Sequence, residues 1–200
     1  MPPHTLIAGL GNPGPKYARN RHNYGFFAAE ALLAAGSSRS QSMGKEGELH
    51  VLRLPGIDGE LLVLKPMAYM NLSGRAVAQV LRFYKIPPAN LIALHDELDV
   101  PLGRLKLKLG GGTAGHNGLK SIVAETGTQD FARLRLGIGR PTGPMEVVSY
   151  VLQDFRPEER LIVEKVLPAA VAAVRLYIIQ GLEVAMREAN GFNAAPPVAG

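Results

Sequence analysis

The chain has 200 residues, a hydrophobic content of 46% and a formal net charge of +5, and it contains no cysteine. This length and composition favour a single α/β domain with one substantial core. The lack of cysteine excludes disulfides, thiolate metal sites and a cysteine nucleophile. The opening residues lack the features of a secretory signal, and no apolar run reaches the 18 residues or so that span a bilayer. We therefore expect a cytoplasmic protein with no membrane partner.

The first predicted strand begins at Leu6 and leads into a turn rich in glycine and proline. Its glycines match the G-x-G-x-x-G pattern of dinucleotide-binding proteins. However, prolines bracket the third glycine and helical periodicity starts only near Phe26, which disfavours a nucleotide site. The glycines instead predict a tight turn that places Asn12 at the carboxyl end of the strand.

A helix is predicted from about Phe26 to a stop near Gly36, because apolar residues recur at helical spacing between them. His22 precedes this helix, with Asn20 as a candidate cap. The helix dipole predicts a lowered pKa for His22 and a neutral imidazole, the form that a general base requires. The polar run Ser37–Ser42 that follows is predicted to be a loop.

Two strands, Glu48–Leu54 and Glu60–Lys65, are predicted to form a hairpin through a Pro-Gly turn. Pro66 ends the second strand, and Asn71 falls in the turn before a helix from about Ser73 to Tyr84. Open α/β sheets bind ligands at this edge, whereas helix capping is the structural alternative for Asn71.

A buried strand is predicted at Leu91–Leu94, and it ends directly in the polar run His95–Asp99. Ionised carboxylates are costly to bury unless they are paired, so these acidic residues need partners. His22 is one candidate partner for Asp96.

Positive charge is concentrated between Pro101 and Arg140, a segment with seven of the 22 basic and two of the 17 acidic residues, which leaves 15 of each sign elsewhere. Within it, Arg104–Leu109 alternates leucines with cations, as in a strand with one solvated face. Solvation explains the alternation but not why every exposed position is positive, which indicates an anionic partner, most commonly nucleic acid. The candidates for phosphate contacts are Arg104, Lys106, Lys108, Lys120, Arg133 and Arg135.

The glycine-rich loop Gly110–Gly118 opens a predicted helix from Leu119 to Glu125. Backbone N–H groups of such a loop and the helix N-terminus are suited to binding an anion. Lys120 lies in the first turn, where a cation opposes the helix dipole, and an external phosphate would offset that mismatch. A strand from Phe131 to Ile138 follows.

The last part of the chain is predicted to be helical, with a short piece from Met145 to about Leu152 and a longer helix from Glu158 towards Gln180, kinked at Pro168. A further helix runs from about Leu182 to Ala189. We expect one domain that ends at residue 193 and a disordered tail from residue 194 to residue 200.

Polar side chains from separate loops are expected to converge at one edge of the sheet. No serine stands out as a nucleophile, so the natural chemistry is attack by a water that His22 deprotonates, with Asp96 orienting the imidazole. The amides of Asn12, Asn71 and Asn117 would bind the carbonyl of an ester or peptide and stabilise an oxyanion.

Five motifs occur along the chain: GLGNPG from Gly9, RHN after Tyr17, KP with MNLSG from Lys65, HDELD from His95 and GHNGLK from Gly115. Together they resemble bacterial peptidyl-tRNA hydrolase, and the resemblance runs from about residue 6 to residue 191. It implies one mixed sheet flanked by helices on both faces, with the C-terminal helices packing beside the active-site cleft.

The resemblance implies a monomeric enzyme, without metal or cofactor, that cleaves the ester between a peptide and the tRNA 3′ end and so recycles stalled tRNA. Its partner would be peptidyl-tRNA, held by the acceptor-arm phosphates and the CCA end. By position, His22 becomes the catalytic base and Asp96 its orienting partner. The residues assigned to substrate binding are Asn12, Tyr17, Met70, Asn71, His116 and Asn117.

Two departures from the family pattern concern the surroundings of the site. Thr113 and Ala114 stand in the glycine loop where the family commonly has a second histidine or another residue followed by glycine, which affects the expected loop mobility. Tyr24 follows the RHN motif where a smaller residue is frequent, which affects the pocket wall. Neither departure removes a proposed catalytic group.

Two other classes of function remain open on the sequence. One is a non-catalytic RNA-binding relative, which the joint presence of His22, Asp96 and the asparagines disfavours. The other is a metal-dependent hydrolase using His22, His95, His116 and Asp96, for which the chain has no H-E-x-x-H or similar ligand spacing.

Overall fold

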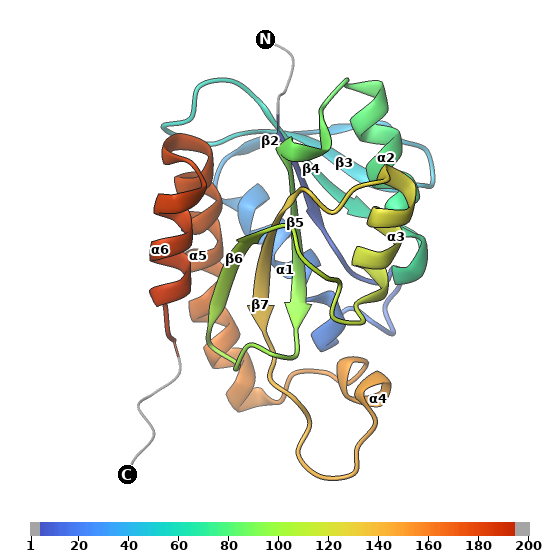
Figure 1. Ribbon diagram of the computed structural model, residues 1–200, viewed down its shortest axis with the longest axis vertical. Helices are drawn as coiled ribbons and strands as arrows, with labels where there is room; N and C mark the ends of the chain where they lie inside the picture. The colour runs from blue at the N-terminus through green and yellow to red at the C-terminus, as the bar shows by residue number, and fades with distance from the viewer. Residues whose placement is uncertain (1–4, 195–200) are drawn as a thin grey trace.

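A computed structural model describes residues 5–194. In it, seven strands form one mixed sheet in the order β2-β3-β4-β1-β5-β7-β6 (Figure 1). The four central strands β4, β1, β5 and β7 are parallel to one another. The pairs β2–β3, β3–β4 and β6–β7 are antiparallel. The strands are β1 (Leu6–Gly9), β2 (Ser37–Gln41), β3 (Gly47–Arg53), β4 (Leu61–Pro66), β5 (Leu91–Glu97), β6 (Leu105–Leu109) and β7 (Ala132–Gly137).

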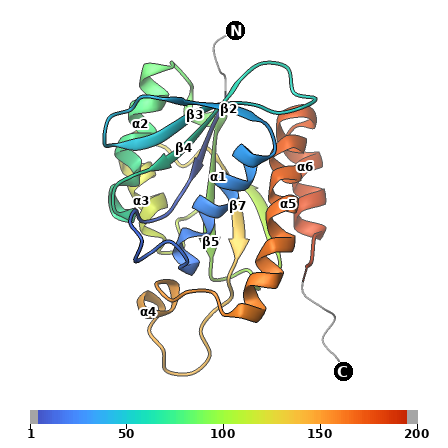
Figure 2. The same cartoon turned by 180° about the vertical axis from the view of Figure 1, so that it is seen from behind.

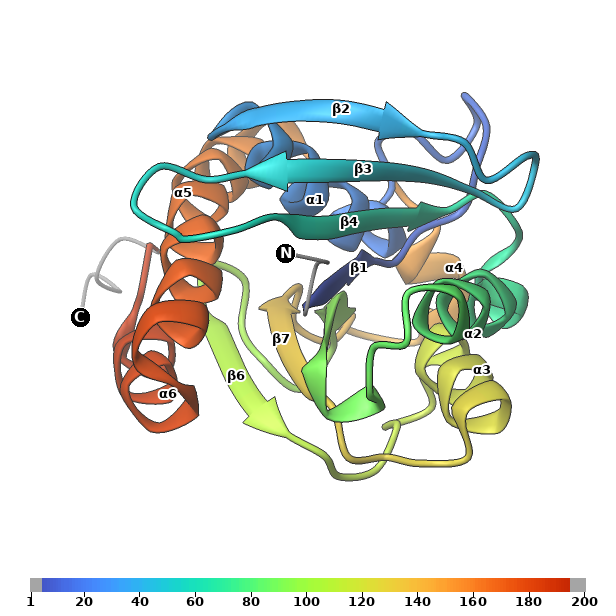
Figure 3. The same ribbon diagram turned by 90° about the horizontal axis from the view of Figure 1, so that it is seen from above.

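Helices cover both faces of this sheet, as the view from above shows (Figure 3). Helices α1, α5 and α6 pack on one face and α2 and α3 on the other. The helices are α1 (Tyr24–Ala34), α2 (Ser73–Phe83), α3 (Asn117–Thr126), α4 (Val147–Val151), α5 (Pro157–Gln180) and α6 (Leu182–Gly191), with 3-10 turns η1 (Arg21–Asn23), η2 (Met70–Leu72) and η3 (Pro88–Asn90). From behind, α1 and α5 are seen against the sheet (Figure 2).

The two sides of the core follow from the alternation of side chains along the central strands. In β5, Ile92 and Leu94 point to the α1, α5 and α6 side, while Leu91 and Ala93 point to the α2 and α3 side. Both faces are buried, which explains why this strand is a continuous apolar run in the sequence. Asp96 continues this alternation at the carboxyl end of the strand.

Helix α1 lies unusually close to the sheet because Gly25 has no side chain. A Cβ at Gly25 would lie 2.2 Å from the carbonyl oxygen of Leu94 and 2.4 Å from the backbone nitrogen of Leu10. The helix therefore begins directly over β1 and β5. This close approach brings η1, and with it His22, to the carboxyl end of β5.

Most predicted elements are present, and two differ. The polar run Ser37–Ser42, expected to be a loop, forms strand β2, because its backbone pairs antiparallel with β3 at the edge of the sheet and its side chains stay exposed. The apolar alternation that marks a buried strand is therefore missing. Strand β5 continues three residues beyond Leu94 to Glu97, so the polar run begins inside the sheet.

The C-terminal helices match their predicted positions, with α5 continuing through Pro168 as one helix. Helix α6 covers the edge of the sheet at β6, where Asn190 accepts a hydrogen bond from the backbone N–H of Leu107. Ala194, placed in the predicted tail, donates its backbone N–H to Gly103. The rest of that tail lies outside the described residues. Within residues 5–194, no helix is long and apolar enough to cross a membrane.

Changing Gly25 to alanine should lower the free energy of unfolding by about 1–3 kcal/mol or more, because the added methyl group meets backbone atoms that cannot yield locally. The control is Gly191→Ala at the end of α6, where no atom lies within 4 Å of the added Cβ. Urea unfolding checks both variants. Equal stability of the two would contradict the close packing of α1.

Candidate active site

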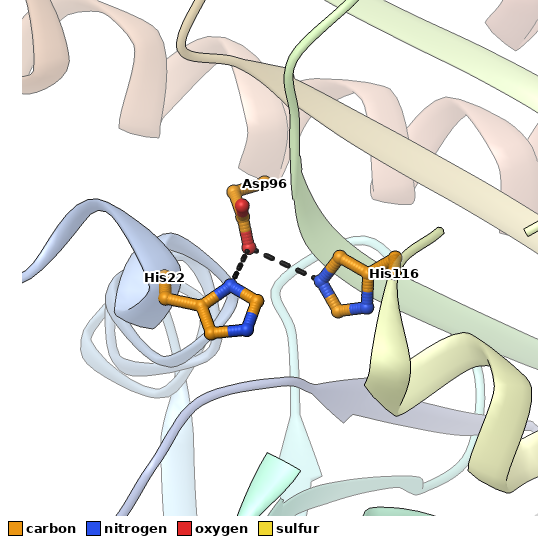
Figure 4. A group of neighbouring side chains, drawn as sticks. All are labelled: His22, Asp96 and His116. Atoms are coloured by element: carbon orange, nitrogen blue, oxygen red, sulfur yellow. Dashed lines mark hydrogen bonds and ion pairs between the residues drawn. The ribbon is translucent and has the colours of Figure 1, made fainter. Parts of the chain in front are cut away.

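A single carboxylate oxygen organises the cleft at the carboxyl end of β5. Oδ1 of Asp96 accepts hydrogen bonds from Nδ1 of His22 at 2.9 Å and from Nε2 of His116 at 3.1 Å (Figure 4). Asp96 is only 4% exposed. The three side chains come from η1, β5 and the loop before α3, which are distant in sequence and adjacent in space.

The hydrogen bonds define which nitrogen of each ring carries the proton. Nδ1 of His116 accepts the backbone N–H of Leu119 as the N-terminal cap of α3, at 3.4 Å, so the proton of its neutral ring lies on Nε2. His22 donates its Nδ1 proton to Asp96, which leaves the lone pair on Nε2 for another partner. This is the tautomer that a histidine base requires.

Burial and the charge of Asp96 shift the pKa of His22 in opposite directions. Burial lowers the pKa of this imidazole, but the negative charge and hydrogen bond of Asp96 outweigh it, so the pKa lies above its usual 6.5. The sequence predicted a lowered pKa from the helix dipole, and this direction is wrong because a carboxylate at 2.9 Å acts more strongly than the start of a helix.

Burial shifts the pKa values of Asp96 and His95 in opposite directions. Burial raises the pKa of Asp96, but electrostatic attraction and hydrogen bonds from His22 and His116 hold it well below the usual range. Burial lowers the pKa of His95 to about 3. His95 is therefore neutral, and its Nδ1 bonds the backbone oxygen of Asp96 at 2.7 Å. It supports the strand end and does not enter the cleft lining.

Asn12 presents an amide to the same cleft. Its backbone pairs reciprocally with the side chain of Asn23, at 2.8 and 2.9 Å, and its Oδ1 accepts the backbone N–H of Met70 at 2.8 Å. Because the oxygen is occupied, the Nδ2 group is the part of the amide that remains available as a donor. Asn12 is one of the residues that line the cleft.

The cleft has a volume of about 280 Å³ and combines a polar floor with an apolar wall. Helix α4 lies beyond the carboxyl ends of β5 and β7 (Figure 1). Its Val147, Val148 and Val151 belong to the apolar wall. The lining residues are Asn12, His22, Asp96, Glu97, Leu98, Ala114, Gly115, His116, Asn117, Val147, Val148, Val151 and Leu152.

Of the residues assigned to substrate binding, Asn12, His116 and Asn117 line the cleft, and the other three do not. Met70 is buried and acts through its backbone N–H on Asn12. Asn71 is exposed, and it does not cap α2, whose first turn has no side-chain cap. Tyr17 lies in the turn before η1, where the ammonium group of Lys16 is 5.6 Å from its ring.

Two structural roles were missed or misplaced in the sequence. Asn23, in the RHN motif, holds Asn12, whereas Asn20 makes no capping bond and donates instead to Asp154 at 2.9 Å. The apolar wall was missed too. Val147 and Val148 are adjacent valines on α4, a helix of five residues that is too short to bury both side chains. Both are exposed, and exposed neighbouring valines are the feature that marks this wall.

Each carboxylate of the HDELD run has a positively charged or hydrogen-bonding partner. Asp96 binds the two histidines, Glu97 lies 3.6 Å from Arg135, and Asp99 pairs with Arg140 at the surface at 2.6 Å. The burial of several acidic groups at one strand end is therefore compensated, as the sequence required.

The predicted phosphate-contact residues divide into two groups. Arg104, Lys106, Lys108 and Lys120 are exposed. Arg133 is 0% exposed and donates to the carbonyl of Gly112 at 2.6 Å, so its placement on the exposed basic face is wrong. Its strand register matches that of Lys108, but the glycine loop covers it. Arg135 is largely buried against Glu97.

The histidine cluster has a geometry that could hold a cation. Ligand atoms of His22, Asp96 and His116 lie within 4.8 Å of one another. The two hydrogen bonds to Asp96 Oδ1 already account for this proximity. His95, the fourth residue of the metal hypothesis, turns its Nδ1 to a backbone carbonyl instead.

Comparison with known proteins gives one consistent result. The family model described as peptidyl-tRNA hydrolase matches residues 6–197. A curated peptidyl-tRNA hydrolase from Solidesulfovibrio magneticus is 49% identical and the match covers 96% of each chain; one from Mycobacterium tuberculosis is 44% identical, covering 94% of this chain and 97% of the relative. The crystal structure of peptidyl-tRNA hydrolase from Acinetobacter baumannii matches with a TM-score of 0.88 at 36% identity, over 98% of both chains.

The electrostatics of the cleft predict an NMR titration. The imidazole of His22 should titrate with a pKa above 6.5, and Asp96→Asn should move this pKa below 6.5, because burial then acts without the compensating charge. Ring ¹H–¹⁵N correlation spectra recorded across pH measure both values. A pKa unchanged by Asp96→Asn would contradict the role of the carboxylate.

Proposed function

Because the chain belongs to the peptidyl-tRNA hydrolase family, and so hydrolyses the ester of peptidyl-tRNA, we propose that His22 is its general base and Asp96 the residue that orients it. The observation that carries this proposal is the 2.9 Å hydrogen bond between His22 Nδ1 and Asp96, which leaves Nε2 of His22 at the cleft with a lone pair.

The reaction follows from this tautomer. Nε2 of His22 takes a proton from a water as its oxygen bonds to the ester carbonyl carbon. The resulting tetrahedral oxyanion collapses, the bond to the ribose oxygen breaks, and the imidazolium returns the proton to that oxygen. Asp96 stabilises the imidazolium charge meanwhile. A positioned base of this kind contributes about 10²- to 10⁴-fold to the rate.

Asn12 is the proposed oxyanion donor, since its Oδ1 is held by Met70 and its Nδ2 group is available at the cleft. Such a donor contributes about 3 kcal/mol. Asn117 and His116 line the same cleft and complete the contacts to the ester. Asn71 and Tyr17 are proposed to contact the substrate outside the cleft, and Met70 to act through Asn12.

The apolar wall of α4 and the exposed cations would contact different parts of the substrate. Val148 and Val151 would face the peptidyl group, because an apolar wall has no partner for phosphates. Lys106 and Lys108 on β6, with Arg104 and Lys120, would contact the acceptor-arm phosphates. Arg135 is held by Glu97 and would add to this surface only at its exposed end.

Three further properties are part of the proposal. The proposed base, its orienting carboxylate and the proposed oxyanion donor lie together in one cleft of a single chain, so the proposed reaction requires no residue from a second copy, and we propose a monomer. Helices α5 and α6, the last of which ends at Gly191, pack into the same core as the sheet, which supports a single domain ending near residue 193. A substrate produced by translation supports a cytoplasmic location.

The central test is release of the N-blocked amino acid from N-acetyl-aminoacyl-tRNA in the presence of EDTA. The protein should release it rapidly, and His22→Ala should reduce kcat by about 10²-fold or more because the base is lost. Loss of the wild-type activity in EDTA would favour the metal-dependent alternative. Binding of the tRNA without any release would favour the non-catalytic alternative.

The burial of Arg133 makes a prediction about salt dependence. Lys108→Ala should raise KM for the tRNA substrate and reduce the slope of log(kcat/KM) against log[salt] by about 1, since one phosphate contact is lost. Arg133→Met should leave this slope unchanged and lower stability instead, because Arg133 is covered by the glycine loop. A reduced slope in Arg133→Met would show that Arg133 contacts phosphate after all.

A further inference from the structure

The residue before the proposed base is a buried cation that the reaction does not use. Arg21 is 3% exposed, and its Nη2 lies 2.6 Å from Oε2 of Glu159, near the start of α5. Its Nη1 donates to the backbone oxygen of Asp154 at 2.9 Å and to that of Gln153 at 3.4 Å. One guanidinium therefore binds a carboxylate and two carbonyls from a segment more than 130 residues away.

Aromatic rings enclose the same guanidinium. Its carbon lies 4.5 Å from the ring centre of Tyr150 and 5.5 Å from that of Phe155. The hydroxyl of Tyr150 in turn donates to the backbone oxygen of Ile138 at 2.7 Å, just beyond β7. The cation–π contacts and the fork of hydrogen bonds together restrict the guanidinium to one position.

Backbone contacts join the same two segments. The N–H of Arg21 donates to the carbonyl of Gln153 at 2.9 Å, and the side chain of Asn20 donates to Asp154 at 2.9 Å. Turn η1 and the segment from Tyr150 to Glu159 are therefore fastened to each other at several points. His22 is the middle residue of this η1 turn.

The fastened segment also includes part of the cleft's apolar wall. Val151 and Leu152 line the cleft, and Tyr150, in the same helix, contacts Arg21. The proposed base and the apolar wall therefore meet at one guanidinium. Neither Arg21 nor Glu159 is among the described residues that line the cleft, so their effect on the reaction must act through the groups they hold.

A buried ion pair is weak evidence of net stabilisation, because removing both charges from water offsets much of their attraction. Its better-supported use is to specify one arrangement of the elements that carry it. Glu159 suits that use because it also accepts the backbone N–H of Arg156 at 2.7 Å, which ties the carboxylate to the first turn of α5.

We propose that Arg21 and Glu159 are positioning residues that hold the His22 turn and the α4 wall in register, so that the base and the peptidyl group meet at the correct distance. This inference rests on the proposed role of His22. Misplacing a reacting group by about 1 Å can reduce a rate by about 10²-fold, so a small shift at this junction is sufficient to affect catalysis.

The test compares Glu159→Gln with Glu158→Gln. Both replace a carboxylate with an amide of the same shape. Glu158, however, is exposed, and within the described residues its one ion pair is with Arg156, at 3.3 Å. Glu159→Gln should reduce kcat for N-acetyl-aminoacyl-tRNA by about tenfold or more with KM changed less than about twofold, because the phosphate-contact residues lie on β6 and α3. Glu158→Gln should match the wild type.

A spectroscopic measurement separates positioning from a general loss of stability. The Nδ1 proton of His22, identified by its absence in His22→Asn, should shift or broaden in Glu159→Gln at a temperature where circular dichroism shows a folded protein. It should be unchanged in Glu158→Gln. Arg21→Lys, which keeps the charge but loses the fork to Gln153 and Asp154, provides a second variant and should also lower kcat.

The outcomes distinguish this inference from the proposed function. Wild-type kcat and an unchanged His22 proton in folded Glu159→Gln and Arg21→Lys would overturn the positioning role, while a collapse of activity in His22→Ala would still support the base. Full activity in His22→Ala would overturn the base itself. A loss in Glu159→Gln confined to KM would also overturn positioning of the base.

Discussion

The buried carboxylate of Asp96 is the constraint on which the rest of the site depends. An ionised group with 4% exposure is stable only if donors reach it, and two imidazoles do so at one oxygen. Helix α1 must then approach β5 closely enough to deliver His22, which the missing side chain of Gly25 permits. The start of α3 must likewise bring His116, whose other nitrogen caps that helix. The same contacts leave Nε2 of His22 free.

The parallel centre of the sheet and its antiparallel edge strand β6 carry different sets of proposed functional residues. Parallel strands β1 and β5 end at one edge, so Asn12 and Asp96 arrive together there. The edge strand β6 has no such crowding, and its solvated positions carry the lysines proposed to contact phosphates. Between the two regions, Arg133 and Glu97 are buried and bind neighbouring parts of the protein. The proposed phosphate-contact residues and the proposed catalytic residues thus occupy adjacent but separate surfaces.

The failures of prediction have identifiable physical causes. Arg133 and Lys108 were both candidates for phosphate contacts, and they are register partners on neighbouring strands, but only the path of the glycine loop decides which of the two is covered. The strand β2 was missed because an exposed edge strand needs no apolar alternation. The pKa of His22 was assigned the wrong direction because its distance to Asp96 is a property of the folded chain. The register set by Arg21 and Glu159 joins residues too far apart in sequence for any local pattern to connect them.

The sequence by itself determined the order of the elements, the apolar run that becomes the central strand, and the residue types available at the cleft, because local periodicity and turn chemistry report directly on these features. It also indicated that the carboxylates after that run required partners. Only the tertiary structure decided which partners they found, which nitrogen of each histidine carries the proton, and which cations remain in contact with water. Those features depend on distances between segments, and such distances exist only once the sheet and its helices have packed.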